Sequence, residues 1–184
     1  MMHMARLRKA ISYRRLERPH TRVSKFTAKS FVKTTHNTKI SSFNMGNPQK
    51  DFPYAVTLRT KADLQIRDNA MNSAREASNR IMEKTIGAGN YYLRVNCYPH
   101  HILRENPLAS GAGADRFSTG MAKSFGKPIG QAVRAKKGKG LFTIFVEKQN
   151  LELAKKALHR ASGKLPCSCG IEVTDNPRMM KAEG

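Results

Sequence analysis

Alternation of apolar and polar residues predicts the strands of this chain. Residues Tyr91–Cys97 (YYLRVNC) place Leu93, Val95 and Cys97 on one side, which is typical of a half-buried strand. Residues Tyr54–Leu58 (YAVTL) are a second candidate strand. Both segments are short, as strands of a small domain are.

Two further strands follow later in the chain. Residues Leu141–Val146 (LFTIFV) form an almost continuous apolar run, rich in aromatic and β-branched residues, which is typical of a central strand. A last short strand is expected at Gly170–Thr174.

Helical spacing predicts two helices between these strands. The first takes Asp68 as its N-cap, runs to about Ile86 and stops at Gly87. The second is capped by Asn150, runs to about Ser162 and ends at Gly163. Their inward faces are expected to hold Met71, Ala74, Ser78, Ile81 and Met82 in the first helix and Leu151, Ala154 and Leu158 in the second. The element order predicts an α+β domain with two helices on one face of a mixed sheet.

The charge of the chain indicates what kind of partner the protein binds. The 184 residues carry 34 Lys and Arg against 13 Asp and Glu, a formal net charge of +21. The excess lies in residues 1–50, with twelve basic residues and one acid, and in 99–140, with eight and two. Residues 51–98 and 141–184 each have seven basic and five acidic residues. Such an imbalance indicates a polyanionic partner, by default nucleic acid.

The changes in charge along the chain predict its domain organisation. Residues 1–50 are expected to be a basic arm embedded in RNA, and 51–175 a single RNA-binding α+β domain. A long basic, glycine-rich loop is expected to protrude at 104–130, and 176–184 form a polar tail. No stretch is long and apolar enough to span a membrane, and the N-terminus lacks the apolar core of a secretory signal.

Phosphate contacts are assigned to basic side chains of these segments, and Tyr13, Phe26, Phe31 and the histidines are expected to stack on bases between the charges of the arm. A cluster of lysines and glycines (KKGKG) precedes the Leu141–Val146 strand, and a flexible, solubilising hairpin tip is the alternative interpretation of it. The predicted RNA-binding residues are Arg6, Arg8, Arg14, Arg15, Arg18, Arg22, Lys25, His100, His101, Arg104, Arg116, Lys123, Lys127, Arg134, Lys136, Lys137 and Lys139.

Catalytic and metal motifs fail on inspection. Gly120 and Gly126 are spaced too widely for a phosphate-binding P-loop, and Lys127 is followed by Pro128 instead of a hydroxyl residue. A dinucleotide fingerprint would need glycine where Arg116 stands. We predict no enzyme, no cofactor and no small-molecule substrate.

The cysteines and histidines also have a plainer interpretation. A cluster of Cys97, His100 and His101 is weighed against a core cysteine with two RNA-facing or solvent-exposed histidines, and the plainer interpretation is preferred. Cys167 and Cys169 lack the spacing of a zinc knuckle, so no metal site is predicted.

Several motifs resemble one ribosomal protein family. They are YLRV from Tyr92, PHHILR from Pro99, SGAGADRFSTGM from Ser110, SFGKP from Ser124 and TKISSFNMG from Thr38. Together with Phe52-Pro53 and KTIG at 84–87 they resemble the archaeal and eukaryotic large-subunit protein family L-ten-e, counterpart of bacterial L-sixteen, over residues 8–175. Gly111 and the Cys167–Cys169 tail are similar to archaeal members.

The resemblance implies an α/β-hammerhead domain bound to large-subunit rRNA near the central protuberance, in the cytoplasmic ribosome. It implies that the loop of residues 104–116 points toward the tRNA acceptor arms in the A and P sites, next to other ribosomal proteins. Loop residues in this role would be Arg104, Ser110, Gly111, Gly113, Asp115 and Arg116. A ribosome assembly factor or RNA chaperone that leaves the mature subunit is the alternative.

Overall fold

The large sheet has five strands that are all antiparallel to their neighbours. A computed structural model describes residues 10–14, 16, 24–32, 37–106 and 125–176. In spatial order the strands are β1 (Asn44–Gly46), β4 (Tyr92–Val95), β7 (Gly140–Val146), β2 (Tyr54–Thr60) and β8 (Cys169–Asp175). The predicted mixed sheet is therefore wrong, because β7 pairs with β4 and β2, and β2 with β8, in antiparallel register. The apolar run at 141–146 does lie at the centre of the sheet, as predicted.

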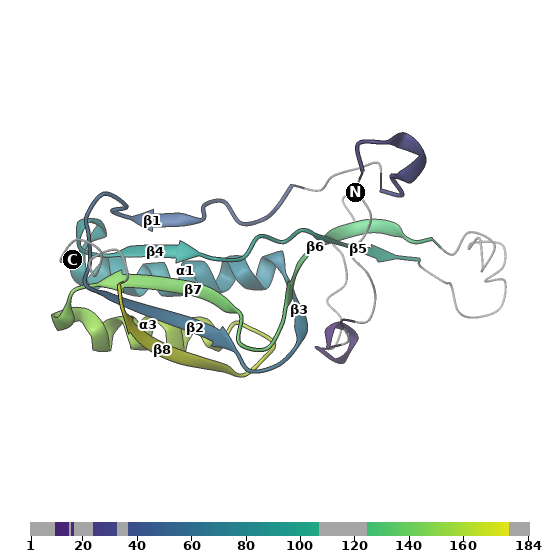
Figure 1. The fold of residues 1–184 in the computed structure, drawn as a ribbon. Coiled ribbons are helices and arrows are strands. Elements are labelled where there is room, and N and C mark those ends of the chain that lie inside the picture. Colours follow the sequence, from purple (N-terminus) through teal and green to yellow (C-terminus); the bar gives the residue numbers. More distant parts are fainter. Residues whose placement is uncertain (1–9, 15, 17–23, 33–36, 107–124, 177–184) are drawn as a thin grey trace.

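Two helices cover one face of this sheet (Figure 1). They are α1 (Asp68–Ile86) and α3 (Leu151–Ser162), and they pack on each other as well as on the strands. Met71, Ala74, Ser78 and Met82 of α1 and Ala154 and Leu158 of α3 are buried as predicted, whereas Ile81 and Leu151 are only half-buried at the margin of the core. The predicted α+β class is confirmed.

The helix starts differ in detail from the prediction. Arg67 is the N-cap residue of α1, and Asp68 is the first residue inside the helix. The Asp68 carboxylate accepts hydrogen bonds from the backbone N–H of Asn69 (2.8 Å) and of Lys39 (3.3 Å). Asn150 precedes α3 as predicted, but its side chain makes no capping hydrogen bond. The negative charge of Asp68 still lies in the first turn, where the helix dipole favours it.

A second, three-stranded sheet was not predicted. Its order is β3 (Leu64–Arg67), β6 (Lys127–Ala135) and β5 (His101–Glu105), again antiparallel. The sequence of β3 (LQIR) does alternate apolar and polar residues, but the alternation lasts only four residues and runs directly into α1, and every residue of the strand is buried, polar ones included. In Figure 1, β5 and β6 extend as a ribbon beyond the end of the large sheet.

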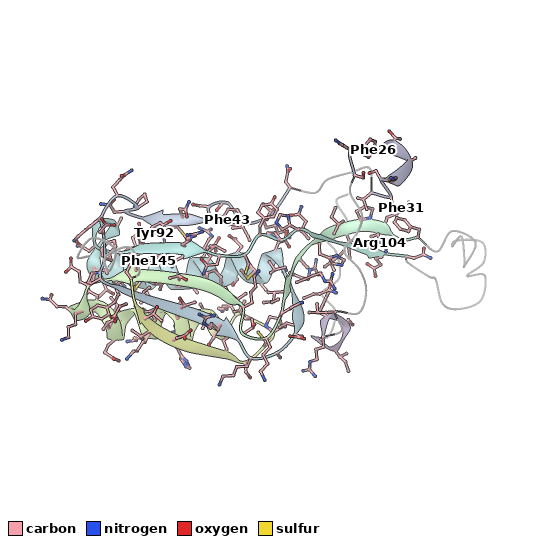
Figure 2. The ribbon with its side chains drawn as sticks, viewed as in Figure 1. Phe26, Phe31, Phe43, Tyr92, Arg104 and Phe145 are labelled. Atoms are coloured by element: carbon pink, nitrogen blue, oxygen red, sulfur yellow. The ribbon has the colours of Figure 1, made fainter. Side chains whose placement is uncertain are left out.

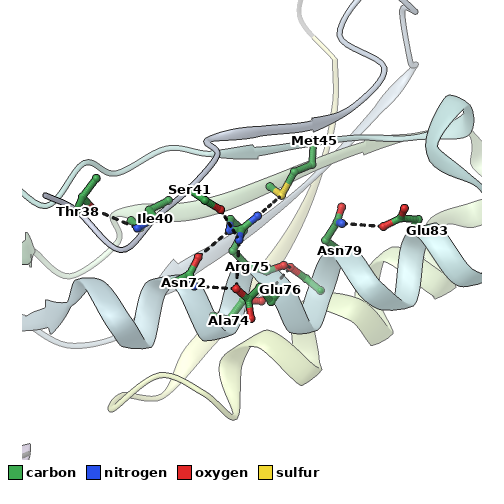
Figure 3. A network of polar contacts seen from close by, with 11 residues as sticks. Thr38, Ile40, Ser41, Met45, Asn72, Ala74, Arg75, Glu76, Asn79 and Glu83 are labelled. Atoms are coloured by element: carbon green, nitrogen blue, oxygen red, sulfur yellow. Dashed lines mark hydrogen bonds and ion pairs between the residues drawn. The ribbon is translucent and has the colours of Figure 1, made fainter.

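The segment that leads into β1 is fixed to α1. Arg75, 8% exposed, donates from Nε to Asn72 Oδ1 (3.0 Å) and from Nη2 to Ser41 Oγ (3.0 Å), and its Nη1 lies 3.3 Å from Met45 Sδ (Figure 3). Ile40 is buried in the same core. The folded body therefore begins before residue 51, because β1 pairs with β4 and residues 37–46 pack on α1.

Tyr91 links helix and sheet through a buried phenol. Its hydroxyl donates to Asn79 Oδ1 (2.6 Å), and its carbonyl approaches Gly46 so closely that a Cβ there would collide with it. Burial raises the pKa of Tyr91 from 10.0 to about 12, and the nearby Glu83 carboxylate adds to the rise. The neutral phenol is therefore favoured by folding.

The raised pKa predicts a loss of stability in alkali. The contribution of Tyr91 is complete below about pH 10, the unfolded value, and is lost as the pH rises toward about 12. We expect Tyr91→Phe to flatten the fall of the unfolding free energy over this range, measured by urea denaturation at several pH values. Tyr92→Phe is the control, because Tyr92 is only half-buried, on the opposite face of β4. A Tyr91→Phe profile parallel to wild type would contradict the assignment.

Candidate nucleic-acid interface

An exposed aromatic and cationic group lies at the outer end of the β5–β6 ribbon. The Arg104 guanidinium carbon lies 3.9 Å from the centre of the Phe125 ring, a cation–π contact. The Phe31 and Phe125 rings lie 6.1 Å apart, and they are 57% and 51% exposed. Flat rings and a guanidinium that face solvent together are suited to stacking on unpaired bases.

Phe26 has a similar setting (Figure 2). The ring is 57% exposed, and the ammonium groups of Lys25 and Lys29 lie 5.2 and 5.7 Å from its centre. Lys29 ends the short 3-10 helix η2 (Thr27–Lys29), and Lys25 precedes it. Two of the three aromatic residues predicted to stack, Phe26 and Phe31, are thus exposed beside cations, whereas Tyr13 at the end of η1 (Ala10–Tyr13) is half-buried.

The lysine cluster forms a turn of residues 136–139 between the two sheets. Gly138 adopts a positive φ of 82°, which suits glycine, and the side chains of Lys136, Lys137 and Lys139 are exposed. The Lys139 N–H donates to the Lys136 carbonyl (3.0 Å), which closes the turn. Three cations therefore project from four consecutive residues.

Hydrogen bonds hold this turn against the end of β2. Thr60 donates its hydroxyl to the Lys136 carbonyl (2.7 Å) and its N–H to the Lys139 carbonyl (3.1 Å), and it accepts the Gly138 N–H (2.8 Å). The Asp63 carboxylate accepts the Lys137 N–H (2.6 Å). The alternative interpretation as a flexible hairpin tip is therefore wrong, because the backbone is fixed and joins two different sheets.

A second aromatic group lies at the base of the ribbon. Phe43 and Tyr98 are stacked with centroids 5.5 Å apart, and the His100 ring lies 4.6 Å from Tyr98. His100 is exposed, whereas His101 is 7% exposed within β5, so the view of both histidines as exposed is wrong for His101. Sequence reasoning missed Phe43 and Tyr98, which are far apart along the chain, although Tyr98 lies two residues from His100.

The cysteines show no activated thiol beside the histidines. Cys97 faces the core as predicted, its thiol donates to the Gly140 carbonyl (3.2 Å), and burial raises its pKa. The thiols of Cys167 and Cys169 lie 3.7 Å apart, and a hydrogen bond from Cys169 lowers the pKa of Cys167. In the part of the chain that the structure describes, no three His, Cys, Asp or Glu side chains are grouped to hold a metal ion.

The structure places ten of the seventeen predicted RNA-binding residues. Arg14, Lys25, His100, Arg104, Lys127, Lys136, Lys137 and Lys139 are exposed, Arg134 is half-buried and His101 is buried. The following lie outside the described residues: Arg6, Arg8, Arg15, Arg18, Arg22, Ser110, Gly111, Gly113, Asp115, Arg116 and Lys123. Lys136, Lys137 and Lys139 are brought together on one turn, and Arg104 is placed apart from them on the ribbon.

No described helix has the length and apolar character to cross a membrane.

Comparison with protein families gives a match over most of the chain. The sequence model of a family described as "Ribosomal protein L16p/L10e" matches residues 17–172. The match includes the small sheet, both helices, the large sheet except the last three residues of β8, and the predicted basic arm from residue 17 onward.

Individual relatives agree with the family match. The protein named large ribosomal subunit protein uL16 in Archaeoglobus fulgidus is 42% identical over 171 residues, which cover 93% of this chain and 95% of the relative. Its counterpart of the same name in Methanococcus maripaludis is 43% identical over 175 residues, or 95% and 98%. That of Methanocella arvoryzae is 41% identical over 156 residues, or 85% and 91%.

Proposed function

The chain belongs to the ribosomal protein L16p/L10e family, and we propose from this that it binds large-subunit rRNA through the exposed cations and rings described above. The family is one of structural ribosomal proteins and not of enzymes. The observation that carries the proposed mode of binding is the turn of residues 136–139. Its backbone, held by hydrogen bonds, presents three lysines to solvent, which reduces the cost of ordering the turn on binding.

The proposed binding combines two kinds of contact, phosphate neutralisation and base stacking. The lysines of the turn neutralise phosphates, a contact that positions the protein without reading sequence. Arg104, Phe125 and Phe31 stack on bases that are splayed out of the RNA helices. Of the predicted basic arm, residues 1–50, the part before residue 37 adds further phosphate contacts as an RNA-embedded segment in this proposal, whereas residues 37–50 join 51–175 in the RNA-binding domain. Residues 176–184 form a polar tail.

We place the protein near the central protuberance of the large subunit, as an α/β-hammerhead domain next to other ribosomal proteins. The β5–β6 ribbon leads into residues 107–124, and we propose that the predicted loop of residues 104–116 reaches toward the tRNA acceptor arms in the A and P sites. Arg104, at the base of the loop, is exposed beside Phe125, so its guanidinium is available to RNA. The peptidyl transfer chemistry itself belongs to RNA in this proposal.

The alternative of an assembly factor that leaves the mature subunit is not favoured. Relatives at about 42% identity over nearly the whole chain are named as proteins of the subunit. An assembly factor would bind the same rRNA, so binding alone does not separate the two, and occupancy of mature subunits does.

Removal of a single stacking ring tests the base contacts. We expect Phe125→Ala to weaken binding to protein-free large-subunit rRNA by about 1 kcal/mol, or about fivefold, because a stacked base loses its platform. The slope of log affinity against log salt should stay at the wild-type value, because no charge is removed. A filter-binding series from low to high salt measures both. Phe145→Ala is the control, since Phe145 stacks with Tyr92 on the large sheet (5.4 Å), away from the ribbon.

Two results would count against this function. If the affinity of the wild-type protein did not fall as salt rises, the proposed phosphate contacts would be contradicted. Each such contact releases counterions and therefore makes the affinity fall steeply with salt. Equal losses for Phe125→Ala and Phe145→Ala would mean that the ribbon has no special part in binding.

A further inference from the structure

One face of the three-stranded sheet holds two arginines that lack partners for part of their guanidinium groups. Arg67 is 8% exposed, and its buried Nε and Nη1 have no hydrogen-bond partner among the residues that the structure describes. The Nε of Arg134 is buried and unpartnered as well. Among the ion pairs of the described residues, none includes Arg67 or Arg134. A buried guanidinium without an anion is unfavourable, because desolvation is not repaid.

The strand register places these arginines on the same side of the sheet. Arg67 lies opposite Ala132, and Gln65 lies opposite Arg134, so Arg67 and Arg134 are diagonal neighbours on adjacent strands. Arg67 Nη2 lies 3.5 Å from the position that a Cβ on Gly130 would take, so the side chain crosses β6 where no side chain is in its way. Arg134 Nη2 donates to the Leu16 carbonyl and so ties the N-terminal segment to this face.

Arg75 is a buried arginine with a structural role, and it serves as a comparison for Arg67. It is also 8% exposed, yet its Nε and Nη2 donate to the side chains of Asn72 and Ser41, and Glu76 lies 3.3 Å away (Figure 3). Arg67 and Arg75 are equally buried, but Arg75 has hydrogen-bond partners that Arg67 lacks among the described residues. Folding alone therefore accounts for Arg75 and leaves the guanidinium of Arg67 unexplained.

We propose that Arg67 is a phosphate-binding residue: its guanidinium donates to a phosphodiester oxygen of RNA on this face of the small sheet, with Arg134 as the neighbouring cation. The inference rests on the proposed function and names a site for it, since a chain of net charge +21 has polyanions as its natural partners. A planar guanidinium offers paired N–H donors that match phosphate oxygens. The anion that the described residues do not provide for Arg67 is thereby supplied on binding.

The test compares Arg67→Met with Arg75→Met in the full chain. Methionine keeps the apolar stem and removes the charge. We expect Arg67→Met to lower the salt slope for protein-free large-subunit rRNA by about 0.7–0.9, which corresponds to about a five- to tenfold loss of affinity at 0.1 M salt. The thermal midpoint of the free Arg67→Met protein should equal or exceed that of wild type, because an unpaired buried charge is removed. Arg75→Met should lower the midpoint and, where it folds, keep the wild-type slope.

A second variant separates charge from geometry. Arg67→Lys keeps the charge and loses the planar pair of donors, so we expect a severalfold loss of affinity with the slope retained. A free Arg67→Met protein that is less stable than wild type would assign Arg67 a structural role and overturn the proposal. An unchanged slope and affinity in a stable Arg67→Met protein would also overturn it and would point to another anion, such as a carboxylate of a protein partner.

These outcomes are distinct from failure of the function itself. If wild type does not bind the rRNA with a steep salt dependence, the proposed function fails and the site loses its basis. If wild type binds and Arg67→Met binds equally well, the site alone is wrong.

Discussion

Replacing Phe142 with alanine lowers the free energy of unfolding of the free protein by about 3–5 kcal/mol. The ring is fully buried in β7, the central strand of the large sheet, within the core cluster that also contains Leu158 of α3. Truncation removes its apolar contacts and leaves a cavity that the surrounding strands cannot close. Because small domains have only about 5–15 kcal/mol of net stability, this change would unfold a large part of the population on mild heating.

Urea denaturation followed by circular dichroism measures this loss. Phe26→Ala is the matched control, because the same atoms are removed from a ring that is 57% exposed, and its cost should stay within about 0.5 kcal/mol. Equal costs for the two substitutions would contradict the assignment of β7 to the core.

Removing the three lysines of the turn has the largest expected effect on RNA binding. We expect Lys136→Gln, Lys137→Gln and Lys139→Gln together to lower the salt slope by about 2–3, since each phosphate contact contributes about 0.7–0.9. If this electrostatic contribution vanishes near 1 M salt, the affinity at about 0.1 M salt falls on the order of a hundredfold to a thousandfold. Binding to protein-free large-subunit rRNA across a salt series measures both quantities.

A control of equal charge distinguishes position from net charge. Lys84, Lys156 and Lys164 are exposed on or just after the two helices, away from the turn. Their joint replacement by glutamine removes the same three charges, and we expect it to leave most of the affinity intact. Similar losses for both triple variants would mean that the turn is not a specific contact and that the overall charge of the protein governs binding.

Four strands of the large sheet and its two helices could be predicted because their patterns are local, whereas the three-residue strand β1 fell within the predicted basic arm and was missed. The alternation of Leu93, Val95 and Cys97 reflects a strand with one buried face. The apolar run around Phe142 reflects a strand that is buried on both faces along most of its length. The glycines at 87 and 163 mark the helix ends. Pairing direction was predicted wrongly, because strand order depends on contacts distant in sequence that the local pattern does not contain.

The small sheet escaped prediction for a different reason. In β3 the alternation of apolar Leu64 and Ile66 with polar Gln65 and Arg67 is only four residues long, and all four side chains are buried, so burial does not follow polarity there. In β6, Pro128 and Gly130 lower the apparent strand propensity of the sequence. Only pairing between strands that are far apart in the sequence makes these segments a sheet.

The candidate interface was predicted in its charges and not in its geometry. The lysines at 136–139 were found from composition, but the hydrogen bonds from Thr60 that fix their turn come from a strand that lies far earlier in the chain. The stack of Phe43 on Tyr98 likewise joins distant segments. Arg67 carries no signal in the sequence, since its distinction is that two of its buried nitrogens find no partner among the described residues.

The central claim is that this protein is a lasting constituent of the large subunit that holds rRNA. The most direct test is sedimentation of a lysate of the source cells through a high-salt sucrose gradient, with this chain quantified against known large-subunit proteins. The account predicts equimolar recovery with the mature large subunit after the wash. Recovery confined to light or precursor fractions would contradict it and would favour an assembly factor.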